Sequence, residues 1–258
     1  MEFTPKRTVG FATIVCFVCS IFVASAAVGL KEKQIENEIL DRQKKVLDVA
    51  GLLTDEVAIS ADNIKKTYQS RVQPKLVALQ DKGCEGQDPT SFDQQKFAKD
   101  PATSKDVVGN RAKVRRTPHC AKIFNIKSAD AKGIETVIFP VEGKGLWSTL
   151  YGYIALNPNG TDIKGLTFYK HAETPGLGGE VDNKKWKAQW KGKKAFKPGS
   201  AAPALYVKKG QANDNYSVDG LSGATITSNG VTNLLQFWLG KQGFGNYINK
   251  EMKGANNG

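Results

Sequence analysis

The sequence predicts an α+β protein in which one membrane-spanning helix and a helical stalk precede a mixed domain of sheet and helices. Three observations lead to this prediction. Residues 9–30 carry no charged side chain, and runs rich in β-branched and aromatic residues recur after Ala121. Apolar residues return every three to four positions after the uncharged segment and again near the C-terminus, which is typical of amphipathic helices.

The uncharged segment 9–30 is long enough to cross a bilayer core of about 30 Å at about 1.5 Å per residue. Lys6 and Arg7 precede it, so we expect residues 1–8 in the cytoplasm and the rest outside, although Lys31 and Lys33 oppose this orientation. A cleaved signal peptide is the alternative, because residues 24–26 resemble a small-residue cleavage site. The segment exceeds the usual signal-peptide core of about 7 to 15 residues, which favours a retained single-pass anchor.

The region after the span predicts helices and then a long insertion. Residues 31–50 have the apolar spacing of an amphipathic helix, and a second polar helix is expected over 55–77. Residues 31–80 therefore form a helical stalk and the start of the outer domain. Residues 81–120 are polar and rich in helix breakers, which indicates a long loop or insertion.

The outer domain proper is expected over 121–258. Its predicted strands are residues 135–142, 150–157, 160–173 and 202–209, and its closing helix is 229–239. The lysine-rich stretch 184–197 interleaves Trp186, Trp190 and Phe196, a pattern that can bind single-stranded nucleic acid. Outside the membrane a solvated helix with its aromatic side chains turned inward is favoured, so we expect no nucleic-acid partner.

The four cysteines fall into two pairs. Cys16 and Cys19 lie in the span as small apolar residues, whereas Cys84 and Cys120 bracket the insertion and are expected to form a disulfide. A metal site using the latter pair with the two histidines, His119 and His171, fits no zinc spacing, so we expect no metal. Because the chain has only two histidines, a histidine-dependent hydrolase is also disfavoured.

The segment 219–230, DGLSGATITSNG, gathers hydroxyl and small residues just before the closing helix. Thr227 or Ser228 can cap that helix, and a glycine allows a tight turn. The same residues can instead seat a phosphate at the helix N-terminus. The residues alone leave both interpretations open.

The run from Asp219 to Thr225 resembles the covalent flavinylation motif of FMN-binding domains. The resemblance implies that Thr225 carries one FMN per chain through a phosphoester, attached by a separate flavin transferase, and that Thr227 stays unmodified. Two further segments are similar to these domains: HAETPGLG, residues 171–178, resembles a turn beside the flavin ring, and GKGLW, residues 143–147, a glycine-tryptophan segment. The cofactor-binding residues implied are Trp147, Glu173, Thr174, Gly176, Leu177, Asp219, Ser222, Gly223, Ala224 and Thr227.

From the anchor to the C-terminus, the chain resembles the C-subunit family of the sodium-translocating NADH:quinone oxidoreductases. The resemblance implies an electron carrier with no catalytic residue or substrate of its own. It would connect an iron–sulfur centre between subunits D and E with the FMN of the B subunit, beside subunits A and F. The chain would be anchored in a bacterial inner membrane, with its large domain in the periplasm. The G subunit of the ion-translocating ferredoxin:NAD oxidoreductase and a membrane-anchored assembly protein without flavin are the alternatives.

Overall fold

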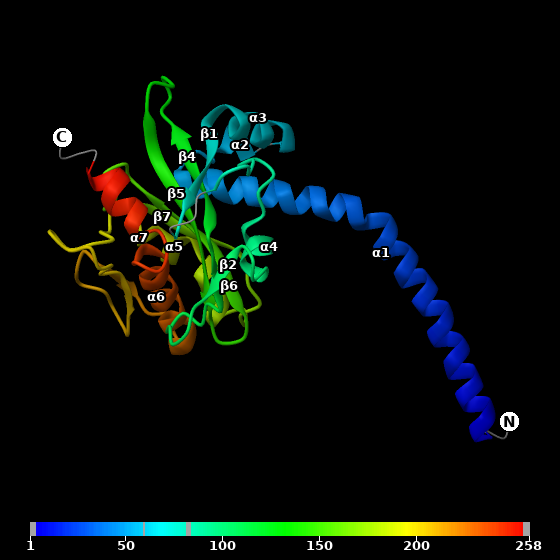
Figure 1. The fold of residues 1–258 in the computed structure, drawn as a ribbon. Coiled ribbons are helices and arrows are strands. Elements are labelled where there is room, and N and C mark those ends of the chain that lie inside the picture. Colours follow the sequence, from blue (N-terminus) through cyan, green and yellow to red (C-terminus); the bar gives the residue numbers. More distant parts are fainter. Residues whose placement is uncertain (1–3, 59, 81–83, 255–258) are drawn as a thin grey trace. The chain divides into compact units, whose positions relative to one another are not determined.

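The computed structural model describes residues 4–58, 60–80 and 84–254. The chain divides into two compact units, one ending at Arg42 and one beginning at Gln43. The first unit is the N-terminal part of helix α1 (Pro5–Ala50), drawn in blue in Figure 1. Among the described residues, α1 is the one helix long and apolar enough to span a membrane, and its most apolar window has a mean hydropathy of 2.5. This is consistent with single-pass anchoring.

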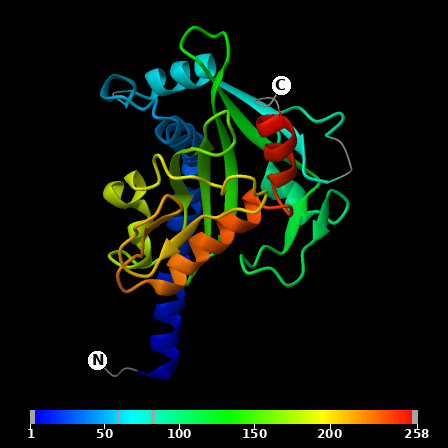
Figure 2. The ribbon, with the colours of Figure 1, turned by 90° about the vertical axis from the view of Figure 1, so that its left-hand side faces the viewer.

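The second unit contains a five-stranded antiparallel sheet in the order β1-β4-β5-β6-β7 (Figure 2). The strands are β1 (Val72–Ala78), β4 (Cys120–Lys127), β5 (Ile134–Lys144), β6 (Thr149–Leu156) and β7 (Ile163–Lys170). The expected strands over 135–142, 150–157 and 160–173 are confirmed as β5, β6 and β7. The structure is the α+β arrangement that the sequence predicts.

The helix expected over 55–77 is wrong over its last six residues, 72–77. Helices α2 (Asp55–Ala58) and α3 (Ala61–Arg71) end before β1, which pairs along its length with β4. Pro74 explains the change, because proline breaks a helix interior but is tolerated on an edge strand, and β1 is an edge of this sheet.

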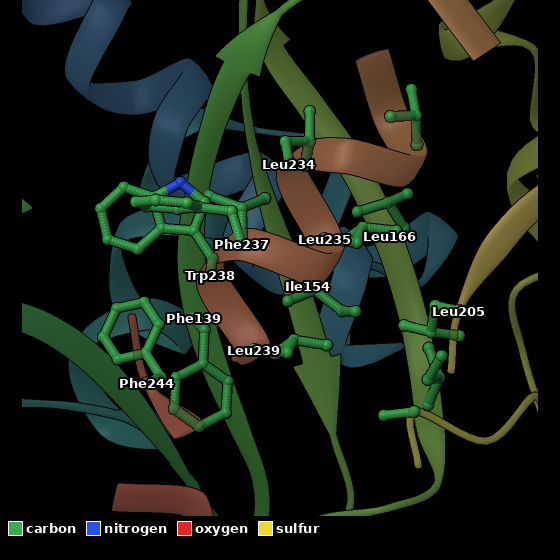
Figure 3. Packing of buried hydrophobic residues seen from close by; sticks show 14 of the residues in the cluster. Phe139, Ile154, Leu166, Leu205, Leu234, Leu235, Phe237, Trp238, Leu239 and Phe244 are labelled. Atoms are coloured by element: carbon green, nitrogen blue, oxygen red, sulfur yellow. The ribbon is translucent and has the colours of Figure 1, made fainter. Parts of the chain in front are cut away.

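Helix α6 (Thr225–Leu239) packs across one face of the sheet (Figure 2). Figure 3 shows its buried side chains gathered with Phe139 of β5, Ile154 of β6 and Leu166 of β7. The helix approaches β5 closely, since a methyl group at Gly143 would lie 2.6 Å from Leu234 Cβ. The helix ends at Leu239 as expected but begins four residues earlier than the predicted Asn229, which puts Thr225 in its first turn.

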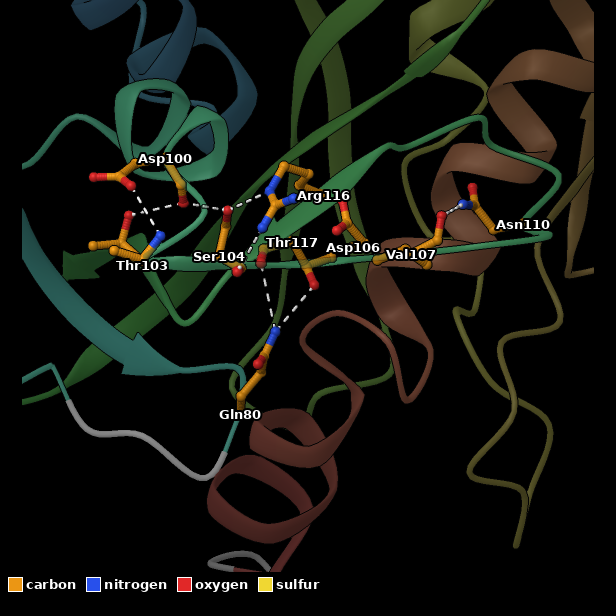
Figure 4. Close-up of polar contacts among 10 residues, drawn as sticks. Gln80, Asp100, Thr103, Ser104, Asp106, Val107, Asn110, Arg116 and Thr117 are labelled. Carbon is orange, nitrogen blue, oxygen red and sulfur yellow. Dashed lines mark hydrogen bonds and ion pairs between the residues drawn. The ribbon is translucent and has the colours of Figure 1, made fainter.

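The insertion is more ordered than a long loop. It contains α4 (Gln94–Lys99) and a small antiparallel pair, β2 (Ser104–Asp106) and β3 (Arg116–Pro118). Arg116 holds the pair together through Ser104 and Asp106, while Gln80 Nε2 donates to Thr117 Oγ1 at 3.2 Å (Figure 4). Such side-chain bonds leave no periodic trace in a sequence, so the regular elements were missed. The predicted Cys84–Cys120 disulfide is confirmed, with a Cα–Cα distance of 5.4 Å, and it occupies both thiols of the metal alternative.

The remaining elements complete the unit around α6. Helix α5 (Lys184–Ala188) is shorter than the lysine-rich stretch, but Trp186, Trp190 and Phe196 are buried, as the inward interpretation predicts. Of the strand expected over 202–209, only three residues form a strand, which is β8 (Tyr206–Lys208). The other elements are the 3₁₀ turn η1 (Gly178–Asp182), the parallel pair β8 (Tyr206–Lys208) and β9 (Ser217–Asp219), α7 (Gly245–Tyr247) and η2 (Ile248–Lys253).

Candidate functional site

The start of α6 lacks a side-chain cap. Its N-cap residue is Ala224, which has no side chain able to accept a hydrogen bond, and Thr225 is the first helical residue with an exposed side chain. The capping alternative is therefore wrong: Thr227 is fully buried, and Ser228 Oγ instead accepts from Leu221 N at 3.1 Å. The first N–H groups of a helix have no intrahelical partner, so this terminus favours an anion beside the Thr225 hydroxyl.

Glu173 connects three segments beneath that terminus. The residue is buried, at 5% exposure. Oε1 accepts from Trp147 N and Ser148 N, both at 3.0 Å, and from the Ser148 hydroxyl at 3.2 Å. Oε2 accepts from Leu146 N at 3.2 Å and from Thr227 Oγ1 at 2.6 Å. One side chain thus joins the β5–β6 turn and the first turn of α6 to the loop that follows β7.

The bonds to Glu173 keep it ionised. Burial raises the pKa of this carboxyl, but the hydrogen bonds from the Thr227 hydroxyl and from the N–H groups of residues 146–148 outweigh burial. The net pKa lies below the ordinary glutamate value. A carboxylate held in this way accepts hydrogen bonds only, and with five donors already in place it orders the loops rather than serving as a proton donor.

Glycines make this junction possible. A methyl group at Gly145 would lie 2.7 Å from Glu173 Oε1, and one at Gly178 would lie 2.7 Å from both Glu173 Oε2 and Thr227 Oγ1. Gly223 has a positive φ of 68°, and a methyl group there would lie 2.9 Å from Leu177 Cδ2. The glycines at these positions allow the 171–178 turn, the 145–148 turn and the 219–225 loop to approach one another.

Large apolar side chains around this junction remain exposed. They are Leu146, Trp147 and Leu177, at 41%, 67% and 44% exposure, and Ile226, at 57%. We call these four residues the apolar rim. Trp147 and Leu177 were expected at the site, whereas Leu146 and Ile226 were missed. Their signal in the sequence was an apolar residue in a glycine turn and an isoleucine directly after the motif threonine.

The other expected site residues lie in different surroundings. Thr174 and Gly176 lie in the exposed turn, where the Thr174 carbonyl accepts from Leu177 N and Gly179 N at 3.1 and 2.9 Å. Ser222 and Gly223 are exposed beside α6. The Asp219 carboxylate is engaged by other segments. It accepts from Ala212 N at 2.6 Å and from Gln189 Nε2 at 3.1 Å, which fixes the start of the 219–225 loop.

No group of three or more histidine, cysteine, aspartate or glutamate side chains that could hold a metal occurs within 4–58, 60–80 and 84–254. The features that do converge suit an organic phosphate ligand. The helix terminus and the exposed Thr225 hydroxyl suit its phosphate, and the apolar rim is a surface that a planar ring can cover.

Comparison with known proteins identifies the same region. Residues 145–240 match the FMN-binding domain family, and this range includes every residue of the junction. The chain is 44% identical to the C subunit of Na(+)-translocating NADH-quinone reductase from Pseudomonas aeruginosa, with 97% of both chains covered. It is 42% identical to the protein of the same name from Yersinia pestis, covering 96% of this chain and 94% of that one.

Two solved structures are similar to this chain in fold as well as in sequence. The crystal structure of Shewanella oneidensis NqrC superposes with a TM-score of 0.70 and 32% identity, covering 81% of this chain and 94% of the other. The C subunit of Parabacteroides distasonis gives a TM-score of 0.66 at 27% identity, covering 85% of this chain and 96% of the other. At about 40% identity to its relatives over almost their whole length, the chain belongs to the C-subunit family of the Na(+)-translocating NADH-quinone reductases.

Proposed function

We propose that this chain is the electron-carrying subunit of a sodium-translocating NADH:ubiquinone oxidoreductase and that FMN is attached to Thr225 by a phosphoester. The observation that carries the proposal is the position of Thr225: an exposed hydroxyl on the first residue of an uncapped helix, inside the flavinylation motif. When bound, FMN supplies one-electron transfer.

The phosphate would lie against the first turn of α6. Thr225 provides the bridging oxygen, and the unpaired N–H groups of the helix terminus balance the phosphate charge. Gly223 lets the backbone come close without a side chain in the way. Ser222 is exposed beside this turn and adds a hydroxyl donor.

The ring would cover the apolar rim. Leu146, Trp147 and Leu177 present apolar surface that the described residues leave exposed, and burying it against an aromatic ring is favourable. Thr174 and Gly176 lie in the same turn as Leu177 and are proposed as further contacts. Glu173 and Thr227 hold the loops of the site together through their mutual bond, so we assign them no direct contact with the ring.

The relatives are named as subunits of the sodium-translocating enzyme. On the family resemblance, we propose that this chain carries electrons between the iron–sulfur centre of subunits D and E and the FMN of the B subunit, beside subunits A and F. Helix α1 would hold it in the inner membrane with residues from about 31 onward in the periplasm, where the transferase acts. The anchor keeps the exposed rim near its redox partners.

The proposal is tested by flavin fluorescence in a denaturing gel. The chain is coexpressed with its flavin transferase, and a fluorescent band must survive denaturation in the wild type and vanish in Thr225→Ala. Ser70→Ala is the matched control, since it removes an exposed hydroxyl in α3, outside the motif, and must keep the band. A fluorescent Thr225→Ala chain would refute attachment at this residue.

A further inference from the structure

His171 lies between Glu173 and an aspartate of η1. Glu173 N donates to His171 Nδ1 at 3.2 Å, and His171 Nε2 lies 2.9 Å from Asp182 Oδ2. A backbone N–H can only donate, so Nδ1 must be unprotonated and accept. The ring proton therefore lies on Nε2 and is donated to Asp182. Both nitrogens of a ring that is only 14% exposed are thus engaged, which fixes its orientation and tautomer.

The contacts continue from Glu173 to the site. The backbone of Glu173 is held by His171, and its carboxylate holds the turn that carries Trp147 and the hydroxyl of Thr227 in α6. A shift of the Glu173 backbone would move these acceptor oxygens relative to five donors. Orientation of a site residue by a carboxylate–histidine pair is a recurrent arrangement in proteins.

We propose that His171 and Asp182 are positioning residues that act through Glu173 to fix the Trp147 turn. The positioning itself belongs to the polypeptide. Its consequence for bound flavin rests on the proposed function.

The carboxylate end of the pair stays charged. Burial raises the pKa of Asp182, but the hydrogen bond from His171 and the charges of Lys45 and Lys187 outweigh burial, so the net pKa lies below the ordinary aspartate value. The bond from His171 Nε2 to this carboxylate holds the ring with Nδ1 facing the Glu173 N–H. If the Nδ1 acceptor is removed, the Glu173 N–H loses its partner and its backbone is no longer held there.

Trp147 provides a readout that needs no flavin. It is 67% exposed, while the other three tryptophans, Trp186, Trp190 and Trp238, are at most 6% exposed. Collisional quenching by acrylamide therefore reports on the Trp147 turn. We choose the full-length chain in detergent at pH 8, in the Thr225→Ala background that removes covalent flavin.

Two substitutions separate the two nitrogens. His171→Asn keeps an acceptor near the Nδ1 position but loses the donor to Asp182, and His171→Gln keeps a donor near the Nε2 position but loses the acceptor. His119→Asn is the matched control, because His119 is the only other histidine in the chain. Near-ultraviolet circular dichroism at pH 8 confirms that each variant has native packing.

We expect quenching in His171→Gln to exceed that of the parent by up to about 1.5-fold, the limit for a ring already two-thirds exposed, as the turn opens locally. His171→Asn and His119→Asn should be quenched like the parent. Equal quenching of His171→Gln and the parent, or the same increase in His171→Asn or His119→Asn, would overturn the proposal. Because flavin is absent, none of these results depends on attachment at Thr225.

Discussion

Thr227 Oγ1 donates a 2.6 Å hydrogen bond to Glu173 Oε2, and both residues are buried. This bond joins the second threonine of the motif segment to the turn after β7, 54 positions away in the chain. The two threonines of the segment therefore have different positions: Thr225 faces solvent, and Thr227 faces the core. The first is available for modification, and the second holds the loops around it.

Breaking the Thr227–Glu173 bond should destabilise the protein without preventing flavin attachment. Thr227→Val keeps the shape of the side chain but removes the donor, so the free energy of unfolding should fall by about 1 to 2 kcal/mol. Urea unfolding of the full chain in detergent measures this, with exposed Ser222→Ala as the control expected to change little. Unchanged stability in Thr227→Val would show that the bond contributes nothing.

Gly178 should tolerate no side chain. A methyl group there meets Glu173 and Thr227 at 2.7 Å, and both are buried, so Gly178→Ala should cost about 1 to 3 kcal/mol of stability and reduce covalent flavin. Gly133→Ala is the matched control, because its φ is not positive and nothing lies within 4 Å of the added methyl group. Equal thermal unfolding of the two variants would contradict the packing described for this junction.

Glu142 should make the protein less stable as the pH rises. Burial raises the pKa of its carboxyl to about 7 from an ordinary 4.5, although the charge of Lys99 lowers it. Between these values the folded chain retains a proton that the unfolded chain has lost. The contribution of Glu142 to stability is therefore greatest below about 4.5, falls as the pH approaches 7 and levels off above it.

The test compares urea unfolding at pH 5 and pH 8. The wild type should be less stable at pH 8 by up to about 3 kcal/mol, the equivalent of a shift of this size. Glu142→Gln cannot titrate and should lose most of that difference. Parallel pH profiles for the two proteins would rule out the contribution of Glu142.

The disulfide should stabilise the insertion and the sheet edge. It closes a loop with a sequence separation of 36, so the chain-entropy account gives about 3 to 4 kcal/mol. Replacing Cys84 and Cys120 together by serine should lower the free energy of unfolding by this amount. Replacing Cys16 and Cys19, which are not bonded, should leave the second unit unaffected. A loss below about 1 kcal/mol in the first variant would contradict this account.

The sequence predicted the elements that carry a strong pattern. The anchor, three central strands and the C-terminal end of α6 follow from apolar runs and spacing. Strand β1 was missed because residues 72–77 have no clear period and Pro74 reads as a breaker unless its place at a sheet edge is known. The elements of the insertion were missed because bonds such as those of Arg116 depend on the folded chain.

The site was predictable as a set of segments but not as a junction. The motif indicated Thr225, and the resemblance indicated the turns around Glu173 and Trp147. Spacing cannot reveal that the Glu173 carboxylate is used by three backbone N–H groups and two hydroxyls, because those donors lie up to 54 positions away. Nor can it show that Asp219 turns toward Ala212 and Gln189.

The most direct test of covalent attachment is mass analysis of peptides from the chain matured with its flavin transferase. The peptide containing Thr225 should carry the mass of one FMN less water, and fragmentation should place it on Thr225 rather than on Thr227 or Ser222. The burial of Thr227 and its bond to Glu173 are the physical reason. Flavin found on Thr227, or no covalent flavin on this peptide, would contradict the account.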